Sequence, residues 1–287
     1  MFMKKFILLK SFQNMWAKNF QECVSQIIFN ETILYDKTLN YIKSREQFSI
    51  DSKSLNNLYY SGYANIPCDY LIPITHTDKS NYVIISHNAK LLPYNIPLPF
   101  GSFLCIKHNN SVIHPYYKKS TCDIKHLRRL SYKFSLEKLV NDAISFINMP
   151  YVWGGRTIHL DLLKYNYCGV DCSGFINLLF RAQGILIPRD SDQQFLRCLP
   201  YDNFNNLPSG GLIFLTNQNK KIDHVMLKLN DKQIIDASKE EGKVRILNKN
   251  ETFLTKNNIL EIKGKEFHAL FGKIKGTTFS ELSYSNL

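Results

Sequence analysis

The chain has 287 residues, of which 44% are hydrophobic, and a formal net charge of +12 at pH 7. The hydrophobic fraction excludes global disorder, and the length is typical of two or three domains rather than one compact core. Seven cysteines occur without a C-x-x-C pair, and an odd number cannot all be bridged within one chain. Reduced thiols are the simpler interpretation, so we expect a cytoplasmic location and leave a periplasmic or exported one open.

The positive charge is dispersed along the chain, and its densest cluster, between Lys118 and Arg129, has no accompanying recognition motif. A solvated basic surface is therefore expected rather than a nucleic-acid partner. The start of the chain resembles a signal peptide only in its two lysines and the short apolar run Phe6–Leu9, because no small-residue cleavage site follows. No stretch approaches the ~20 apolar residues of a membrane span, so no integral membrane segment is expected.

Residues 1–130 contain short β-branched and aromatic runs separated by Asn, Asp, Pro and Gly clusters. This pattern is typical of small antiparallel barrels. The length accommodates two such barrels, residues 1–76 with an N-terminal extension and residues 77–130, with a boundary near His76–Ser80. The expected strands are Ser25–Leu34, Asn40–Lys43, Tyr59–Ala64, Tyr82–Ser86 and Ser102–Ile106.

Helical periodicity begins at Ser135, which is expected to cap a helix that carries an apolar stripe from Leu136 to Ile147 and ends before Pro150. A second helix is expected from residue 172 to a glycine cap at 184, because apolar residues recur at helical spacing between them. Strands follow, so residues 131–287 are predicted to form an α+β domain with helices packed on an antiparallel sheet. The expected strands are Leu212–Thr216, His224–Leu229, Gln233–Ser238, Lys243–Leu247 and His268–Ile274.

Cys172 stands at the predicted start of the second helix. The unpaired backbone N–H groups and the positive end of the helix dipole favour a thiolate there over a thiol. A thiolate nucleophile also needs an imidazole base, and the imidazole needs a third group to fix its tautomer. Cys172 is therefore a candidate nucleophile, and its partners are expected further along the chain.

His224 and Asp236 are the candidate partners of this thiol, because each lies on one of two neighbouring predicted strands. With a two-residue hairpin centred on Asn230, the two residues would lie directly opposite each other. The pairing therefore favours a Cys172–His224–Asp236 constellation. The alternative is that His224 is a surface histidine at a strand end and Asp236 a solvated acid beside a turn.

Five segments resemble, in order, the motifs of the NlpC family of papain-like cysteine peptidases: Pro150–Gly155, Asp171–Phe175, Ile187–Gln193, Ile222–Val225 and Ile234–Ala237. The resemblance implies hydrolysis of peptidoglycan stem peptides, usually at the bond between γ-D-glutamate and a diamino acid such as diaminopimelate. It assigns Cys172 as nucleophile, His224 as general base and later acid, and Asp236 as the orienting residue. The family more often has His at the position of Asp236, and this departure bears on the pH optimum.

The same resemblance places five residues in the substrate pocket of the catalytic domain. For Asp171 a helix cap is an additional interpretation, and for Trp153 a plain core position is an alternative. The five residues are Tyr151, Trp153, Asp171, Ser173 and Ser191.

The N-terminal half resembles the tandem bacterial SH3-like domains of cell-wall recycling members of the family. In such proteins the first barrel overhangs the active site, where an acidic residue and a tyrosine bind the free N-terminus of the stem peptide. Glu31 and Tyr63 occupy the matching segments. A surface acid at a strand edge and a tyrosine at the rim of the core are the alternatives.

The segment 157–168 is longer than the family pattern leads one to expect and is a candidate lid or pocket wall. Its Cys168 raises a redox alternative, a regulatory disulfide with Cys172. A thiol acyltransferase on a related fold and an inactive cell-wall-binding protein are the other function classes left open. No metal-ligand spacing is visible, so no cofactor is expected. Peptidoglycan-derived peptides are the expected partners, and the oligomeric state is left open.

Overall fold

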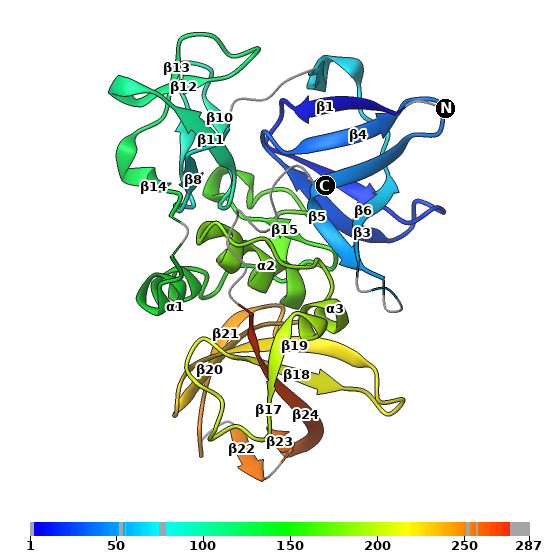
Figure 1. The fold of residues 1–287 in the computed structure, drawn as a ribbon, viewed down its shortest axis with the longest axis vertical. Helices are drawn as coiled ribbons and strands as arrows, with labels where there is room; N and C mark the ends of the chain where they lie inside the picture. The colour runs from blue at the N-terminus through cyan, green and yellow to red at the C-terminus, as the bar shows by residue number, and fades with distance from the viewer. Residues whose placement is uncertain are drawn as a thin grey trace.

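The computed structural model describes residues 3–51, 54, 56–74, 79–131, 133–250, 253–256 and 258–275. Two all-β units lie at one end of the molecule, the helices lie in the middle, and a large antiparallel sheet forms the other end (Figure 1). The predicted class, two small β units followed by an α+β domain, is confirmed. The boundary expected near residues 76 and 77 lies outside the described residues.

The first β unit is a seven-stranded sheet with the order β3-β2-β6-β5-β4-β1-β7. The expected single strand Ser25–Leu34 is wrong, because Asn30 adopts a φ of 63° and divides the run into β3 and β4. Two N-terminal strands that the pattern did not predict, β1 and β2, belong to the same sheet. The strands are β1 (Lys4–Leu8), β2 (Phe12–Trp16), β3 (Cys23–Ile28), β4 (Thr32–Asp36), β5 (Tyr41–Ile50), β6 (Asn57–Tyr63) and β7 (Leu71–Pro73).

The second β unit has a five-stranded sheet with the order β13-β12-β11-β8-β14 and a separate β9–β10 pair. Phe29 of the first unit is wholly buried in the core of the second. The two units therefore share apolar packing. The strands are β8 (Tyr82–Ile84), β9 (Lys90–Leu91), β10 (Ile96–Pro97), β11 (Phe103–Ile106), β12 (Ser111–Ile113), β13 (Ser120–Thr121) and β14 (Leu127–Arg129).

The third part contains three α-helices, the short β15–β16 pair and an eight-stranded sheet in which β17 pairs with β24 and the other strands run β21-β20-β19-β18-β24-β23-β22. The helices are α1 (Leu136–Ser145), α2 (Cys172–Ala182) and α3 (Ser191–Leu196). The strands are β15 (Arg156–Thr157), β16 (Gly169–Val170), β17 (Cys198–Tyr201), β18 (Leu212–Thr216), β19 (Ile222–Asn230), β20 (Gln233–Ser238), β21 (Lys243–Asn248), β22 (Phe253–Lys256), β23 (Ile259–Ile262) and β24 (Lys265–Ile274).

Helix α2 is the centre of the molecule, because each of its residues is buried. Its apolar side packs in one core cluster with strands of the large sheet, and Ile28 and Phe100 bring both β units into that cluster. The apolar stripe that the sequence periodicity predicts for α2 explains the packing of only one face of this helix. The opposite face meets the β units through polar and charged side chains, which have to be paired to be tolerated there.

Helix α1 begins where the sequence predicts. The Ser135 hydroxyl accepts a hydrogen bond from the backbone N–H of Lys138 and so caps the first turn. At the end of α2, Gly184 has a φ of 78°, and its N–H donates to the Arg181 carbonyl. A left-handed residue in this position closes the helix as a glycine cap should. In the part of the chain that the structure describes, none of the helices has the length and apolar character needed to cross a bilayer.

Candidate active site

Cys172 is the first residue of α2, and 7% of the residue is exposed. The helix start is held close to the preceding Gly154-Gly155 turn. A Cβ on Gly174 would lie 2.2 Å from the carbonyl oxygen of Gly155, so only glycine permits this approach. The backbone N–H groups of the first turn have no acceptors within the helix, which makes this position favourable for negative charge.

Asp171 caps this helix, because its Oδ1 accepts a 2.6 Å hydrogen bond from the backbone N–H of Gly174. The same carboxylate is held by the Arg189 guanidinium, at 3.1 Å to Oδ1 and 2.7 Å to Oδ2. Arg189 also donates to the Ser173 hydroxyl at 2.8 Å. Asp171 and Ser173 are therefore engaged within the protein, and the negative charge of Asp171 is neutralised by Arg189.

His224 and Asp236 are joined by a 2.8 Å contact between Nε2 and Oδ2. Asp236 is only 1% exposed, whereas the His224 side chain is 20% exposed. The charge of Cys172 also acts on the imidazole, so the thiol and the ring lie near each other. Because Nε2 is engaged by the carboxylate, Nδ1 remains for the thiol. The structure therefore brings the three predicted residues together as thiol, imidazole and carboxylate in one row.

The strand register differs from the one expected. Leu227 pairs with Ile235 and Lys228 with Ile234, so the hairpin is shifted by two residues from a direct pairing of His224 with Asp236. A shift of two keeps both side chains on the same face, because side chains alternate with a period of two. His224 and Asp236 thus meet as diagonal neighbours rather than as a directly opposed pair.

The environment of His224 favours its charged form. Burial of the imidazole lowers its pKa, but the hydrogen bonds with Asp236 and Cys172 and the charges of both outweigh burial and raise the pKa of His224 from 6.5 to about 10. A raised pKa means that the folded protein binds the proton more tightly than the unfolded chain. The charged pair therefore stabilises the fold fully below pH 6.5, and this contribution is lost as the pH rises through about 10.

Asp236→Asn is expected to lower the pKa of His224, because the amide keeps a hydrogen-bond acceptor but carries no negative charge. An NMR titration of the His224 ring signals would show the midpoint moving from about 10 toward 6.5. Asp223→Asn is the matched control, since Asp223 is an exposed acid on the same strand. An unchanged midpoint in Asp236→Asn would mean that the carboxylate does not control the imidazole.

The other predicted pocket residues of this domain differ in exposure and in their partners. Tyr151 is partly buried, and burial followed by the charge of nearby Cys172 raises its pKa, which places its ring near the thiol. Trp153 is 52% exposed, and its Nε1 donates to the Glu22 carboxylate at 2.7 Å. The alternative of a core tryptophan is therefore wrong. Ser191 is the first residue of α3 and is partly exposed.

Glu31 does not reach the surface, and its expected role as an exposed acid that binds the substrate is corrected by its surroundings. The residue is 0% exposed, and its Oε2 pairs with the Arg156 guanidinium at 2.9 Å. It also accepts hydrogen bonds from the Ile28 N–H, the Ser44 hydroxyl and the Gln47 amide. Burial acts to raise the pKa of Glu31, but the neighbouring guanidinium groups and these hydrogen bonds lower it overall. Glu31 therefore joins the first β unit to β15 of the third part.

Two further buried ion pairs involve α2 and its surroundings. Arg181 of α2 pairs with Glu46 of β5 at 2.5 Å. Arg189, which holds Asp171, also donates to the Ser25 hydroxyl of β3 at 2.9 Å. The N-terminal sheet is therefore connected by hydrogen bonds to the residues on either side of the nucleophile.

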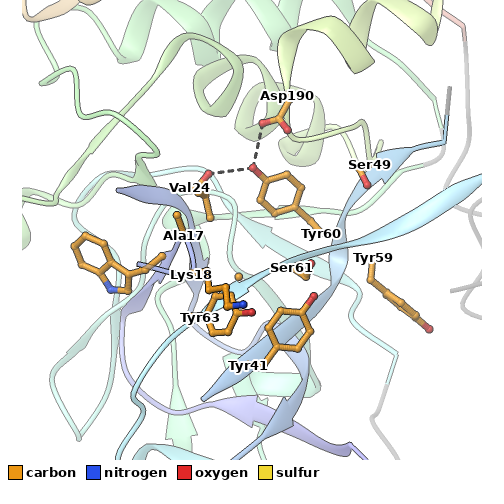
Figure 2. A pocket seen from close by; sticks show the side chains of 12 residues that line it. Ala17, Lys18, Val24, Tyr41, Ser49, Tyr59, Tyr60, Ser61, Tyr63 and Asp190 are labelled. Carbon is orange, nitrogen blue, oxygen red and sulfur yellow. Dashed lines mark hydrogen bonds between the residues drawn. The ribbon is translucent and has the colours of Figure 1, made fainter. Parts of the chain in front are cut away.

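Tyr63 lies in a pocket on the first β unit, together with residues of β2, β5 and β6. The pocket has a volume of about 440 Å³, and Asp190 of the catalytic part closes one side. Figure 2 shows the Tyr60 hydroxyl between Asp190 and Val24, with Tyr41 and Tyr63 on the side of the pocket away from Asp190. The Tyr60 hydroxyl lies 3.2 Å from Asp190 Oδ1 and 3.2 Å from the Val24 carbonyl.

The segment 157–168 packs against the second β unit. His159 is wholly buried and its Nε2 lies 2.8 Å from the Ala89 carbonyl, while the Leu160 N–H donates to the His87 carbonyl. The end of the segment approaches the pocket wall, because the Tyr167 ring packs edge-on against Trp16 at 5.5 Å. The structure thus gives this segment a wall position rather than that of a lid over Cys172.

The redox alternative finds no support in the geometry of Cys168. Cys168 and Cys172 are both free cysteines. The Cys168 sulfur points toward the carbonyls of Thr157 and His159, and burial raises its pKa to about 11. A buried thiol that remains protonated is a poor partner for thiol–disulfide exchange.

Sequence reasoning missed several residues that shape the site. Arg189 and Asp190 lie within the motif Ile187–Gln193, but the sequence pattern predicts no role for either. Arg245, which contacts Asp236, lies in the expected strand Lys243–Leu247, and the sequence pattern predicts no functional role for it. The available signal was cross-strand pairing, which requires the correct hairpin register. Among the described residues, no group of three or more His, Cys, Asp or Glu side chains could hold a metal ion.

Residues 148–262 match the family model described as the NlpC/P60 family. The chain is 26% identical over 186 residues to a protein of Bacillus cereus named gamma-D-glutamyl-L-lysine dipeptidyl-peptidase, a match that covers 62% of this chain and 50% of the relative. It is 29% identical over 136 residues to the peptidoglycan endopeptidase RipB of Mycobacterium tuberculosis, covering 44% of this chain and 53% of that one. The chain thus spans about half the length of these curated relatives.

A solved structure of an NlpC/P60 family protein from Bacillus cereus ATCC 10987 superimposes with a TM-score of 0.71. The match covers 93% of this chain and 98% of the other, at 17% identity. At this identity the likeness concerns the fold alone. The shared fold extends over nearly the whole chain and therefore includes the β units that precede the catalytic part.

Proposed function

We propose that this chain, whose residues 148–262 form a domain of the NlpC/P60 family, is a cysteine-type hydrolase of peptidoglycan stem peptides. The specific reaction that we propose is cleavage of the γ-D-Glu–diaminopimelate bond in peptides with a free amino-terminal L-Ala. The observation that carries the proposal is the grouping of Cys172, His224 and Asp236, with the thiol at a helix start and the imidazole in contact with Asp236 and near Cys172. This arrangement fits nucleophilic catalysis.

The chemistry follows from the positions of these groups. The Cys172 thiolate attacks the amide carbonyl, and the C–N bond breaks as His224 gives its proton to the leaving amine. The backbone N–H of Cys172, which has no acceptor within the helix, can donate to the oxyanion that forms in between. The acyl group then remains on sulfur as a thioester. Neutral His224 takes a proton from water, whose oxygen attacks the thioester and releases the peptide acid and the thiol.

Asp236 orients the imidazole in this scheme. Its Oδ2 accepts the Nε2–H, which leaves Nδ1 directed to the thiol and then to the leaving amine. A carboxylate stabilises the imidazolium more than a neutral acceptor would. Because His224 acts as the acid toward the leaving amine, a raised pKa favours activity at neutral to alkaline pH.

The pocket beside Asp190 supports the recognition of a free amino end. An ammonium group prefers a carboxylate and hydroxyls that water has difficulty in reaching, and Asp190, Tyr60 and Tyr63 line this pocket. Burial raises the pKa of Asp190, while the Arg189 charge opposes this. An incoming ammonium would compensate for the burial. Asp190 therefore replaces Glu31 as the proposed acid.

The position of this pocket also fits a substrate that reaches the thiol. Asp190 directly follows Arg189, and Arg189 holds Asp171, the residue before Cys172. Peptides that extend only a short way from the scissile bond could therefore contact both groups. The name of the Bacillus cereus relative, a dipeptidyl-peptidase, describes an enzyme that acts two residues from an amino end.

Acetylation of the amino group of L-Ala-γ-D-Glu-diaminopimelate is expected to lower kcat/KM by about 10- to 100-fold, because a charged hydrogen bond to Asp190 is lost. Liquid chromatography and mass spectrometry of the released product measure the cleavage rates of the free and the acetylated peptide. Asp190→Asn should reduce the difference between the free and the acetylated peptide. Asp192→Asn, at an exposed acid of the same helix, is the matched control and should preserve the difference.

The outcomes separate two parts of the proposal. Absence of cleavage of both peptides by the wild-type protein would contradict the hydrolase. Equal cleavage of the free and the acetylated peptide would support the proposed hydrolase activity and contradict recognition of the free amino group. A lysine-containing peptide run in parallel identifies the preferred diamino acid.

A further inference from the structure

Asp236 is held from both neighbouring strands. On one side His224 of β19 contacts Oδ2 at 2.8 Å. On the other side Arg245 of β21 lies directly opposite Asp236 in the strand register, and its Nε donates to Oδ1 at 3.1 Å. Both oxygens of this buried carboxylate therefore have a charged or polar partner, each supplied by a different strand.

From Asp236 and Arg245, a chain of ion pairs with alternating charge extends to the surface of the protein. Arg245 also pairs with Glu241 at 3.3 Å, and Glu241 pairs with Lys263. The Arg245 side chain is largely buried, whereas Glu241 and Lys263 are more exposed. Exposed ion pairs contribute little on their own, so the inner contact between Arg245 and Asp236 is the one expected to matter.

We propose that Arg245 is a positioning residue of the active site, which fixes the rotation of the Asp236 carboxylate and limits the negative charge that Asp236 presents to His224. This inference rests on the proposed function, because it concerns the same three reacting and orienting groups. Arg245 itself contacts neither the thiol nor the imidazole. Its effect therefore has to pass through Asp236.

The physical reason is the broad torsion of a carboxylate. The terminal torsion of an aspartate has no sharp rotamer wells, so one hydrogen bond does not fix its plane. A guanidinium N–H on the second oxygen defines the plane and has the directional geometry that a lysine ammonium lacks. With the plane fixed, the His224 ring is held with Nδ1 toward Cys172.

The guanidinium charge also opposes overstabilisation of the imidazolium. Two titratable groups face the His224 ring, Cys172 from α2 and Asp236 from β20. On its own strand the neighbouring acid Asp223 is exposed, and on β18 the residue paired with His224 is the apolar Leu215. Asp236 and Cys172 favour the charged ring, and Arg245 is the cation next to this group. Without it, the ring would hold its proton to a higher pH and regenerate the neutral base less readily.

Two measurements on Arg245→Met test this proposal. An NMR titration of the His224 ring, assigned with His224→Gln, should show a higher midpoint than in the wild type. Hydrolysis of L-Ala-γ-D-Glu-diaminopimelate should show kcat lowered by about 10- to 100-fold, less than the loss of an entire acid–base group, with KM nearly unchanged. The alkaline limb of the pH profile should move upward with the ring midpoint.

Arg245→Lys and Lys243→Met are the comparison variants. Arg245→Lys keeps the charge and should restore the wild-type midpoint, with kcat still reduced because the ammonium does not fix the carboxylate plane. If Arg245→Met does not fold, the reduced kcat of Arg245→Lys still tests the proposal. Lys243→Met removes a cation from the same strand two residues away and should change neither quantity.

The result that overturns the proposal is a wild-type midpoint together with a kcat within twofold of wild type in folded Arg245→Met. Because the titration needs no substrate, it stays informative if the wild-type protein fails to cleave the peptide. A raised midpoint without any wild-type hydrolysis would support the positioning of Asp236 and contradict the proposed function alone.

Discussion

Cys172→Ala is expected to lower the rate of diaminopimelate release from L-Ala-γ-D-Glu-diaminopimelate by at least about 10⁴-fold. The substitution removes the protein atom that bonds to the acyl group in the proposed scheme. The remaining N–H groups of the helix start and the binding contacts cannot form a thioester. Liquid chromatography and mass spectrometry of the products would measure the residual rate.

Cys168→Ala is the matched control, since Cys168 is a buried cysteine of the preceding segment whose sulfur faces backbone carbonyls. It is expected to retain most of the activity, which would also dismiss a redox role for the pair. Thermal unfolding of both variants would show that each is folded. Cleavage that persists at the wild-type rate in Cys172→Ala would refute the mechanism.

Glu31→Ala is expected to lower the free energy of unfolding by about 3–5 kcal/mol. The substitution leaves the Arg156 guanidinium buried without its carboxylate, and both side chains are wholly inaccessible in the native protein. Burial already lowers the pKa of Arg156 to about 10, although Glu31 acts to raise it. Urea denaturation followed by tryptophan fluorescence would measure the loss.

The double variant Glu31→Leu with Arg156→Met provides the control for this prediction. Replacing both charges by apolar groups of similar volume removes the unpaired charge, so much of the lost stability should return. Arg156→Met alone should be destabilising, like Glu31→Ala. If Glu31→Ala instead raised KM for the free-amine peptide and left unfolding unchanged, Glu31 would be a substrate residue and not a buried link.

The sequence pattern was sufficient for the central elements of the site. The period of the apolar residues in α2, the cap at its start and the alternation along β19 and β20 are local properties. They place Cys172 at a helix end and put His224 and Asp236 on one face. The expected register was wrong by two residues, and the prediction of proximity survived because an even shift preserves the face.

The environment of Glu31 could not be derived from its own segment. Its partner Arg156 lies 125 positions away in sequence, on a strand that packs beneath the first β unit. A local pattern distinguishes an acid in a strand from one in a turn, but not a free sheet edge from one covered by another domain. Burial across such an interface depends on tertiary packing alone.

Arg245 was missed for a related reason. The strands Gln233–Ser238 and Lys243–Leu247 are expected from the sequence without a register between them, and in the structure Ser238 pairs with Lys243. That register determines which cation faces Asp236. Strands β22 and β23 were missed as well, because strands of four residues are too short to give a clear periodic signal.

The identity of the bond broken in L-Ala-γ-D-Glu-diaminopimelate tests the central claim most directly. Mass spectrometry of the products formed by the wild-type protein should show the dipeptide L-Ala-D-Glu and free diaminopimelate, both absent with Cys172→Ala. Release of free alanine, or an intact tripeptide after incubation with the folded wild-type protein, would contradict the account.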